Sequence, residues 1–359
     1  MIRIKSDQLK QIMKEVLLAA GVSPENSELT AEILLQADMR GINTHGALRL
    51  PVYLKRIAAG SVAANPEMKV TLDRKAVAVI DGGHGLGQIS GHKAMKLAIE
   101  KAGNCGIGSV WVVNGHHFGA GAYYTALAAE ADMIGFAVSN TVPLMAPWGG
   151  REARVGNNPM AVCIPAGKEP PILLDMAFSQ VAQGKISLAM AKGEKIPLDW
   201  AIDKEGSPTD DPTAAMEGLL LPAGGYKGYG QAVIADLLSG ILQGAGIGGQ
   251  VKAMRCLDQR QNSGQMYLAI DISAFQDPAE FKVKVDEYIR WMKKTPGAQG
   301  TEEIFLPGQQ SWARLEESRV RGIRLPEAVF DELIQEGDQL GIDIRPLIPP
   351  PEASLQGME

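Results

Sequence analysis

The chain has 359 residues, of which 45% are hydrophobic and 21% charged, and its formal net charge is −6. This length and composition are typical of a globular enzyme with two or three packed units, and the acidic balance gives no general attraction to nucleic acid or anionic lipid. The three cysteines lie far apart without metal-ligand spacing, so we expect no disulfide framework, no metal site and a reducing, cytoplasmic compartment. No segment has the apolar length of a signal-peptide core or of a membrane span.

The first 58 residues are predicted to be helical. Ser6 precedes an apolar stripe at helical spacing and is expected to cap the first helix. Ser23 and Pro24 supply a capping residue and a proline at the first position of a second helix. A third helix is expected over about 52–59.

From about residue 68 the pattern changes to short β-branched runs with helical segments between some of them. This mixture indicates an α/β or mixed α+β centre. The expected strands cover 68–72, 76–81, 108–113, 133–140, 160–165 and 264–272, and the expected helices cover 91–102, 181–193, 230–242, 278–294 and 326–340. The proline-rich tail, 346–359, is predicted to be disordered.

The stretch VIDGGHGLGQISGHKAM, residues 79–95, carries a glycine cluster between a predicted strand and a predicted helix. A Rossmann fingerprint needs glycines at fixed spacing and an acidic residue about 20 positions later, at the end of the next strand. That strand ends in Asn114-Gly115-His116-His117, so no acid is available to hold a ribose. We therefore favour a tight turn, in which glycine supplies backbone freedom, over a dinucleotide site.

The first candidate for chemistry is the stretch RGINTHGALRLPVYLKRI, in which His45, Arg49 and Tyr53 share one face at a spacing of four, beside Thr44. Pro51 delays the start of the regular helix. A guanidinium can grip a carboxylate with two parallel hydrogen bonds, and a neighbouring histidine can exchange a proton near neutral pH. On spacing alone, a helix-capping histidine and an arginine paired with a surface acid are the favoured interpretation.

The second candidate is the loop NGHHFGAGAYY, 114–124, which leaves a strand and enters a helix through small residues. Gly119, Ala120 and Gly121 let a ligand approach the backbone at a helix start, where amide donors favour anions. By itself the loop is also consistent with paired histidines that only cap this helix.

Later polar loops hold two further candidates. Asp175 follows an apolar strand, which is a common position for a functional carboxylate and also for a helix cap. Lys227 lies among four glycines, a setting that suits contact with phosphate, although the spacing of a Walker lysine is absent.

Taken together, these stretches resemble the type-2 malate/L-lactate dehydrogenase family, which also contains ureidoglycolate, sulfolactate and diketogulonate oxidoreductases and cyclic-imine reductases. The resemblance covers about residues 2–345. The motifs that carry it are RGINTHGALRLPVY, NGHHFGAGAYY, APWGGREARVGNNPMAV, LLDMA, AQGK, PAGGYKGYG and FLPGQ.

The resemblance implies a homodimer with a non-Rossmann nicotinamide-binding fold of α/β (mixed α+β) class, built on a central mixed sheet. It places a helical subdomain at 9–58 with 311–345 and a NAD(P)-binding domain at 121–264. The segments 59–120 and 265–310 are expected to supply the central sheet and the dimer contacts.

The resemblance also implies roles for individual residues. His45, preceded by Thr44 where serine is commoner, matches the catalytic histidine, and Arg49 matches the arginine that binds the substrate carboxylate. His117, rather than His116, matches a histidine treated in some members as the proton acceptor and in others as a cofactor contact. The other expected substrate contacts are Tyr53, Asn157 and Lys185, and the expected cofactor contacts are His117, Phe118, Gly119, Ala120, Gly121, Asp175, Met176, Ala177, Lys227, Gly228, Pro307, Gly308 and Gln309.

Three of these positions bear on specificity. Asn157 stands where the family usually has threonine, and Gln309 stands where it usually has glutamate. Lys185 follows the dehydrogenase pattern at a position where cyclic-imine reductases tend to carry an acid.

The expected function is hydride transfer between NAD or NADP, with NAD slightly favoured, and C2 of a small 2-hydroxy or 2-oxo acid such as malate or lactate. The alternatives are reduction of a cyclic imino acid or of a larger 2-oxo acid on the same scaffold and, more remotely, non-catalytic binding of a small molecule. Neither nucleic acid nor a membrane is expected as a partner.

Overall fold

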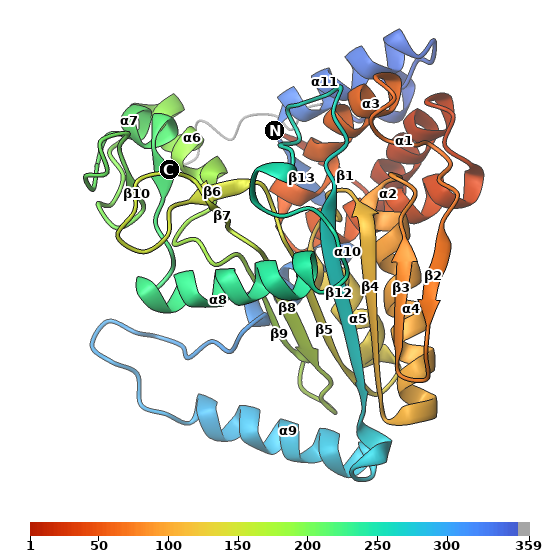
Figure 1. The fold of residues 1–359 in the computed structure, drawn as a ribbon, viewed down its shortest axis with the longest axis vertical. Helices are drawn as coiled ribbons and strands as arrows, with labels where there is room; N and C mark the ends of the chain where they lie inside the picture. The colour runs from red at the N-terminus through yellow and green to blue at the C-terminus, as the bar shows by residue number, and fades with distance from the viewer. Residues whose placement is uncertain (351–359) are drawn as a thin grey trace.

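The computed structural model describes residues 1–350, which form a helical unit, a central sheet and a smaller unit beside the sheet (Figure 1). The helical unit contains β1 (Ile2–Ile4), α1 (Ser6–Ala19), α2 (Pro24–Met39), α3 (Leu50–Ala58), α10 (Gln309–Arg321), β13 (Ile323–Leu325) and α11 (Glu327–Gln339). The sheet and its helices are β2 (Lys69–Asp73), β3 (Val77–Asp81), α4 (Gly87–Cys105), β4 (Ile107–Gly115), α5 (Gly121–Glu130), β5 (Met133–Ser139), β8 (Met160–Ile164), β9 (Ile172–Met176), β12 (Ser263–Asp271) and α9 (Pro278–Lys293). The smaller unit contains β6 (Pro143–Met145), β7 (Val155–Gly156), α6 (Gln183–Lys192), β10 (Ala201–Ile202), α7 (Pro212–Glu217), β11 (Leu219–Leu220) and α8 (Tyr226–Asp236).

The central sheet has seven strands in the order β2-β3-β4-β12-β5-β8-β9. β3 and β4 are parallel and joined by α4, whereas the other neighbouring strands are antiparallel. The mixed α/β class predicted from the strand and helix pattern is confirmed. Because β12 pairs with both β4 and β5, the sheet joins strands from 59–120 and 265–310 with strands from 121–264, and the expected boundary at residue 121 does not divide it.

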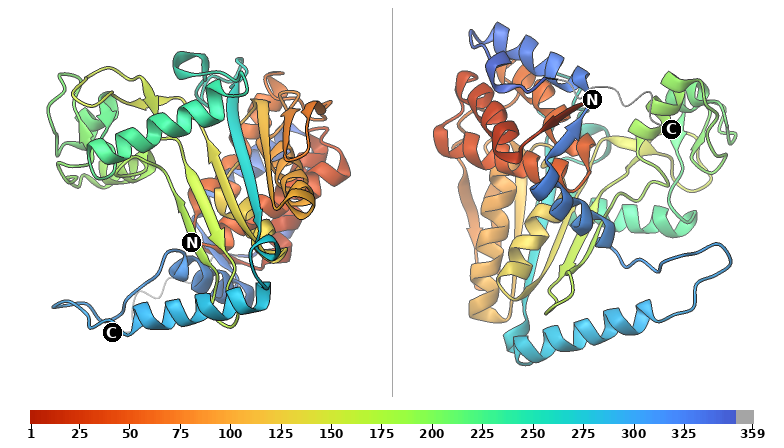
Figure 2. Two further views of the ribbon diagram at one scale, coloured as in Figure 1. Left: turned by 60° about the horizontal axis from the view of Figure 1, so that its bottom comes forward. Right: turned by 180° about the vertical axis from the view of Figure 1, so that it is seen from behind.

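Helices cover both faces of this sheet. One face carries α4 and α5, which are seen from behind in Figure 2, and Met95 and Tyr124 pack there against Val110 and Tyr267. The other face carries α8 and a π-helical turn, Leu237–Ile241, which follows it directly. Strand β4 is therefore buried along most of its length, which explains its nearly continuous apolar run, whereas the edge strand β2 is mostly exposed.

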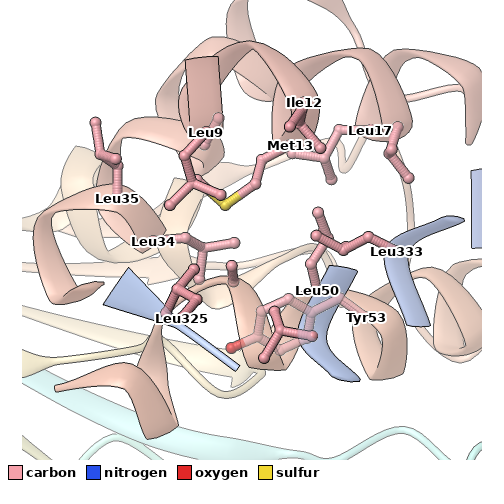
Figure 3. Packing of buried hydrophobic residues seen from close by; sticks show 14 of the residues in the cluster. Leu9, Ile12, Met13, Leu17, Leu34, Leu35, Leu50, Tyr53, Leu325 and Leu333 are labelled. Atoms are coloured by element: carbon pink, nitrogen blue, oxygen red, sulfur yellow. The ribbon is translucent and has the colours of Figure 1, made fainter. Parts of the chain in front are cut away.

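The core of the helical unit draws residues from both ends of the chain, as Figure 3 shows. Leu9 and Leu17 of α1 and Leu34 of α2 pack with Leu50 of α3 and Leu333 of α11, and each of these five leucines is fully buried. Strand β1 pairs with β13, so the first and last strands of the chain also meet.

The two predicted helix caps have different outcomes. The prediction for Ser6 is wrong, because Ser6 is already the first helical residue and Lys5, with an extended backbone and no side-chain hydrogen bond, precedes it. The cap at Ser23 is confirmed, since its hydroxyl accepts from the amide of Asn26 and Pro24 opens the helix.

The other expected helices and strands are present, with shifted ends. The largest shifts are at α4 and α8, which begin four residues before their expected starts, at Gly87 and Tyr226. Part of the tail predicted to be disordered is ordered, because Leu347 and Ile348 pack against the helical core, and 351–359 lie outside the described residues. Within residues 1–350 no helix is both long and apolar enough to cross a bilayer.

Leu333→Ala should lower the free energy of unfolding by about 2–5 kcal/mol, because it removes buried methyl groups and leaves a cavity at the contact between the chain ends. Leu198→Ala is the matched control, since its side chain is 58% exposed, and it should change stability by less than about 0.5 kcal/mol. Equal effects in urea denaturation would contradict the packing of the C-terminal helix into the N-terminal core.

Candidate active site

The turn that carries His45 is held by a buried carboxylate. Two short 3-10 turns, Asn43–His45 and Ala47–Arg49, lead into α3, whose regular helix starts at Leu50 as Pro51 predicts. Asp38 accepts a 2.7 Å hydrogen bond from the amide of Ala47, and a Cβ at Gly46 would overlap the Asp38 carboxyl group. The absence of a side chain at Gly46 therefore allows Asp38 to fix this turn.

Asp38 is only 2% exposed, and burial raises its pKa to about 7, against the opposing effect of the Ala47 hydrogen bond. Its second carboxylate oxygen has no hydrogen-bond partner among the described residues. The Asp38 carboxyl group therefore supports the turn, and the charge of this carboxyl group changes near neutral pH.

Two histidines meet next to this turn. The rings of His45 and His117 are stacked with their centroids 5.4 Å apart. The Thr44 hydroxyl lies 3.0 Å from Nδ1 of His45, and the Tyr53 hydroxyl lies 2.6 Å from Nδ1 of His117. Each imidazole is thus oriented by a hydroxyl at Nδ1, which leaves both Nε2 atoms free of these contacts.

Gln88 adds a further link behind Tyr53. Its amide group donates a 3.0 Å hydrogen bond to the Tyr53 oxygen, which leaves the tyrosine O–H proton for Nδ1 of His117. This arrangement favours the neutral His117 tautomer that carries its proton on Nε2, facing away from Tyr53.

Gln88 belongs to the glycine cluster between β3 and α4. The cluster forms the expected tight turn, with the amide of Gly85 donating to the carbonyl of Gly82. A Cβ at Gly87 would overlap the backbone oxygen of His116, so glycine there lets the start of α4 pack against the loop that carries His117. The space at this helix start is filled by protein backbone.

Burial, and to a smaller extent the charge of Arg49, lower the pKa of His45 to about 4. The pKa of His117 also lies well below its ordinary value, first through burial and then through His45 and Arg49. Both imidazoles are therefore neutral at pH 7 in this structure, and burial raises the pKa of Tyr53 to about 12, so its hydroxyl keeps its proton.

Arg49 supplies the cation of this cluster. Its Nε donates a 2.5 Å hydrogen bond to the carbonyl of Thr44, and the side chain is half-buried. The terminal nitrogens of the guanidinium take no part in that bond, so a two-point contact with a carboxylate remains open to them.

The remaining histidines lie elsewhere. His116 points toward Arg56, 3.5 Å away, and burial lowers its pKa to about 3. His84 lies edge-on to His116, and His92 lies 3.1 Å from the Tyr123 hydroxyl. Of the two adjacent histidines, only His117 joins His45.

The side chain of Phe118, an expected cofactor contact, belongs to the core. It is 3% exposed and stacks on Tyr124, with Tyr267 edge-on to it. Any ligand contact from Phe118 would therefore come from its backbone.

The end of β9 joins the loops that were expected to bind the cofactor. Asp175 accepts a 2.8 Å hydrogen bond from the amide of Ala122 in the first turn of α5, and burial raises its pKa to about 6 despite this bond. Just beyond β9, Phe178 donates to the carbonyl of Asn157 and accepts from the amide of Ala223. The loops at 119–122, 157, 175–178 and 223 are therefore neighbours.

The expected contact residues differ in exposure within this region. Met176, Lys185 and Lys227 are exposed, and Gly184 lies close to Thr44, which brings the start of α6 beside the histidines. Asn157 accepts a 2.9 Å hydrogen bond from the Thr141 hydroxyl.

The late turn at 307–309 reaches β9 as well. The amide of Leu173 donates to the carbonyl of Pro307, and Gly308 has a positive φ of 83° with its backbone against Leu173. Gln309 turns away from this contact, since its side-chain amide donates to Glu303 and its oxygen accepts from the amide of Leu306.

Asp38, Gln88 and Gln261 are absent from the expected site residues, although each supports a histidine. The side-chain oxygen of Gln261 accepts a 2.8 Å hydrogen bond from the amide of His117. For Asp38 the signal was available, because it is a carboxylate on the buried face of a helix just before the His45 turn. Gln88 and Gln261 carry no such signal, since only the fold brings Gln88 close to Tyr53 and Gln261 close to His117.

The chain is similar to known proteins in both sequence and fold. Residues 4–334 match the malate/L-lactate dehydrogenase family. The chain is 40% identical to the L-sulfolactate dehydrogenase of Methanocaldococcus jannaschii, covering 96% of this chain and 99% of that protein, and 38% identical to the malate dehydrogenase of Pyrococcus abyssi, covering 95% and 96%. The solved structure of the Methanocaldococcus jannaschii enzyme superposes with a TM-score of 0.91 at 39% identity, covering 96% of this chain and 99% of that one.

The protein is therefore a NAD(P)-dependent dehydrogenase of 2-hydroxy acids. The chain belongs to the malate/L-lactate dehydrogenase family. Among its relatives, a ureidoglycolate dehydrogenase carries NAD(+) in its name and a sulfolactate dehydrogenase carries NADP(+).

Asp38→Asn should make stability less dependent on pH between about 4 and 7. The folded-state pKa of Asp38, about 7, lies above its ordinary value of 3.8. The stabilising free energy that Asp38 contributes to the folded state is therefore complete below pH 4 and is lost as pH rises through 7. Asparagine can still accept from Ala47, so the variant should gain stability relative to wild type over this range, by about 1.4 kcal/mol per unit of pKa shift removed. Urea denaturation at several pH values measures this, with exposed Asp331→Asn as the control; a constant difference between Asp38→Asn and wild type would refute it.

Proposed function

We propose that this enzyme transfers hydride between a nicotinamide and C2 of a small 2-hydroxy or 2-oxo acid, with substrates of the malate or lactate type. The observation that carries the proposal is the convergence of His45 and His117, each oriented by a hydroxyl group, beside the guanidinium of Arg49. This set combines a carboxylate-binding cation with proton-exchanging groups, which reduction of a 2-oxo acid requires.

Arg49 binds the substrate carboxylate through its terminal nitrogens, with Tyr53 and Asn157 near the bound acid. Lys185 lies in the first turn of α6, next to Gly184, whose backbone approaches Thr44. A second cation on this side suits a second acidic group, so malate and sulfolactate, the substrates named for the relatives, are favoured over lactate.

His45 exchanges the proton at the substrate oxygen, and Thr44 orients it. A neutral His45 accepts this proton when the hydroxy acid is oxidised, and the protonated ring returns it when the oxo acid is reduced. His117, with its proton on Nε2, donates a hydrogen bond at the nicotinamide side of the substrate or shares the proton transfer.

The surroundings of Asp175 fit a nicotinamide dinucleotide. A cavity of about 410 Å³ beside the end of β9 is lined by Asp175, Pro307 and Gly308. Arg40 and Arg314 also line it. The loop 117–121, the segment 175–177, Lys227 with Gly228 and the turn 307–309 would hold the cofactor, which supplies the hydride acceptor or donor when bound.

Reduction of a cyclic imino acid is the second candidate on this scaffold. A solved Δ1-piperideine-2-carboxylate reductase shares the fold with a TM-score of 0.84 at 26% identity. Lys185 weighs against this candidate, because a cation there disfavours an iminium substrate.

We also propose that the enzyme is a cytoplasmic homodimer. Along α8 and the turn after it, Ile234, Leu237, Ile241 and Leu242 are 44–61% exposed, an apolar face that a second copy can cover. The proposed compartment rests on the cysteine content, since three cysteines far apart in the sequence are not the pattern of a disulfide framework.

One substrate panel tests the proposed function. Oxaloacetate, sulfopyruvate, pyruvate, a ureidoglycolate-type oxo acid and a cyclic imine are each offered with NADH and with NADPH. The highest kcat/KM is expected for a 2-oxo acid with a second acidic group. Turnover of the imine alone would replace this function by the second candidate, and no change in NADH or NADPH fluorescence on titration would indicate a non-catalytic binding protein.

His45→Ala and His117→Ala should separate two roles in single-turnover measurements. Loss of His45 should slow hydride transfer at saturating substrate by about 10²-fold or more, because the proton has no partner. Loss of His117 should weaken cofactor binding in addition to slowing hydride transfer. Near wild-type turnover in both variants would refute the assignment, and His92→Ala, outside the cluster, is the control.

Arg49→Lys should raise the KM for the oxo acid by about tenfold or more with a smaller change in kcat, because the two-point contact with the carboxylate is lost while the charge remains. Steady-state kinetics measure this split. An unchanged KM would exclude Arg49 as the carboxylate ligand.

A further inference from the structure

Arg56 is a buried cation near the end of α3, three positions after Tyr53. Its side chain is 1% exposed, although charged residues are rarely found inside a protein. Within residues 1–350 its hydrogen bonds go to backbone carbonyls and to one imidazole, rather than to a carboxylate. Burial of a charge costs free energy unless hydrogen bonds replace those made by water, so these partners indicate which part of the structure Arg56 stabilises.

The three carbonyl partners of Arg56 belong to one loop. Nη1 donates to the carbonyls of Met254 at 3.1 Å and Cys256 at 2.7 Å. Nη2 donates to the carbonyl of Gln259 at 2.6 Å. This loop, 251–262, precedes β12 and contains no helix or strand. Because a planar guanidinium holds its donors in a fixed fork, the three carbonyls that it binds have a fixed spacing and orientation.

The same loop brings Gln261 to the loop that carries His117. The side-chain oxygen of Gln261 accepts the 2.8 Å hydrogen bond from the amide of His117, and Gln261 is only 6% exposed. The carbonyl of Gln261 accepts from the amide of Lys252, which closes the loop on itself. Gln261 lies two positions after Gln259, so a displacement of the carbonyl bound to Arg56 is passed on to Gln261 through two peptide units.

Tyr53 and Arg56 lie on one face of α3 and contact the two histidines in different ways. The Tyr53 hydroxyl lies 2.6 Å from Nδ1 of His117, and Nη2 of Arg56 lies 3.5 Å from Nδ1 of His116. These four residues and Gln261 enclose a cavity of about 10 Å³, which is the space of about one water molecule. The packing around His117 therefore leaves little room for its loop to move.

We propose that Arg56 is a positioning residue for His117: it fixes the loop 251–262 against α3 and thereby holds Gln261 at the amide of His117. One turn of α3 then orients the His117 ring directly, through Tyr53, and its backbone indirectly, through Arg56 and Gln261. The inference rests on the proposed function only in giving His117 a part in the reaction.

Arg56→Met retains an apolar side chain of similar reach and removes its donors. It should lower kcat for the preferred acid of the substrate panel by about tenfold or more, because a displaced imidazole loses its alignment with the reacting atoms. The KM for this acid should change by less than about twofold, since the loop does not hold Arg49. Lys55→Met is the matched control: it removes an exposed cation of the same helix, paired with Glu336 at 3.2 Å, and should change kcat and KM by less than about twofold.

The double variant of Arg56→Met with Gln261→Ala tests the route to His117. If Arg56 acts through Gln261, the two substitutions remove one shared contact, and the double variant should be no slower than the slower single variant. Effects on kcat that multiply in the double variant would overturn this route.

Amide hydrogen exchange of the full-length protein, measured by mass spectrometry, tests the contact without any activity. In Arg56→Met, exchange should rise by about tenfold in peptides that cover 114–119 and 252–262 and should stay at the wild-type rate in β5. An equal rise in all three segments would show that Arg56 contributes only general stability, and it would overturn the positioning role.

Arg56→Lys keeps the proposal testable if Arg56→Met does not fold, because it retains the charge and loses the planar fork. It should show the same exchange pattern and a smaller loss of kcat. Wild-type exchange and kcat in a folded Arg56→Lys and Gln261→Ala would overturn the inference and leave the dehydrogenase function intact. If wild-type protein turns over no acid of the panel, the proposed function fails, while the exchange measurement still decides whether Arg56 holds the His117 loop.

Discussion

The insertion of β12 between β4 and β5 is the constraint on which the active site depends. This strand arrives late in the chain and forms antiparallel ladders with both neighbours. Gln265 on β12 donates a 2.7 Å hydrogen bond to the carbonyl of His116, and Gln261, just before β12, accepts from the amide of His117. A loop that would otherwise be free to move is thereby held at two successive residues.

The burial that orients the histidines also sets their charge. Both imidazoles are neutral because they are desolvated next to the cation of Arg49. The carboxyl group of Asp38 accepts a hydrogen bond from the amide of Ala47 and so supports the turn. The cluster therefore presents one fixed positive charge and two neutral rings. An anionic substrate supplies the balancing charge, and its arrival favours protonation of the histidine that faces it.

Near β9, the guanidinium of Arg40 lies buried over the Trp312 ring, and two of its nitrogens have no hydrogen-bond partner among the described residues. The charge of Arg40 is opposed by the nearby carboxyl groups of Asp175 and Glu130, whereas Arg49 is the cation beside the histidines.

The sequence alone determined the mixed α/β class, the longer helices, six strands of the central sheet and the turn at His45, because apolar periodicity, Ser-Pro caps and the position of Pro51 act over a few residues. The short strands β1, β6, β7, β10, β11 and β13 were not expected. The resemblance of its ordered motifs indicated the family. The tertiary structure decided which strands share a sheet, that Gln88 reaches Tyr53 from the glycine turn and that the Phe118 side chain belongs to the core. It also decided that Arg40 lies buried over Trp312, with two nitrogens that have no hydrogen-bond partner among the described residues. These features depend on contacts between residues far apart in the chain, such as the 144 positions between His117 and Gln261, and no local pattern records such a pairing.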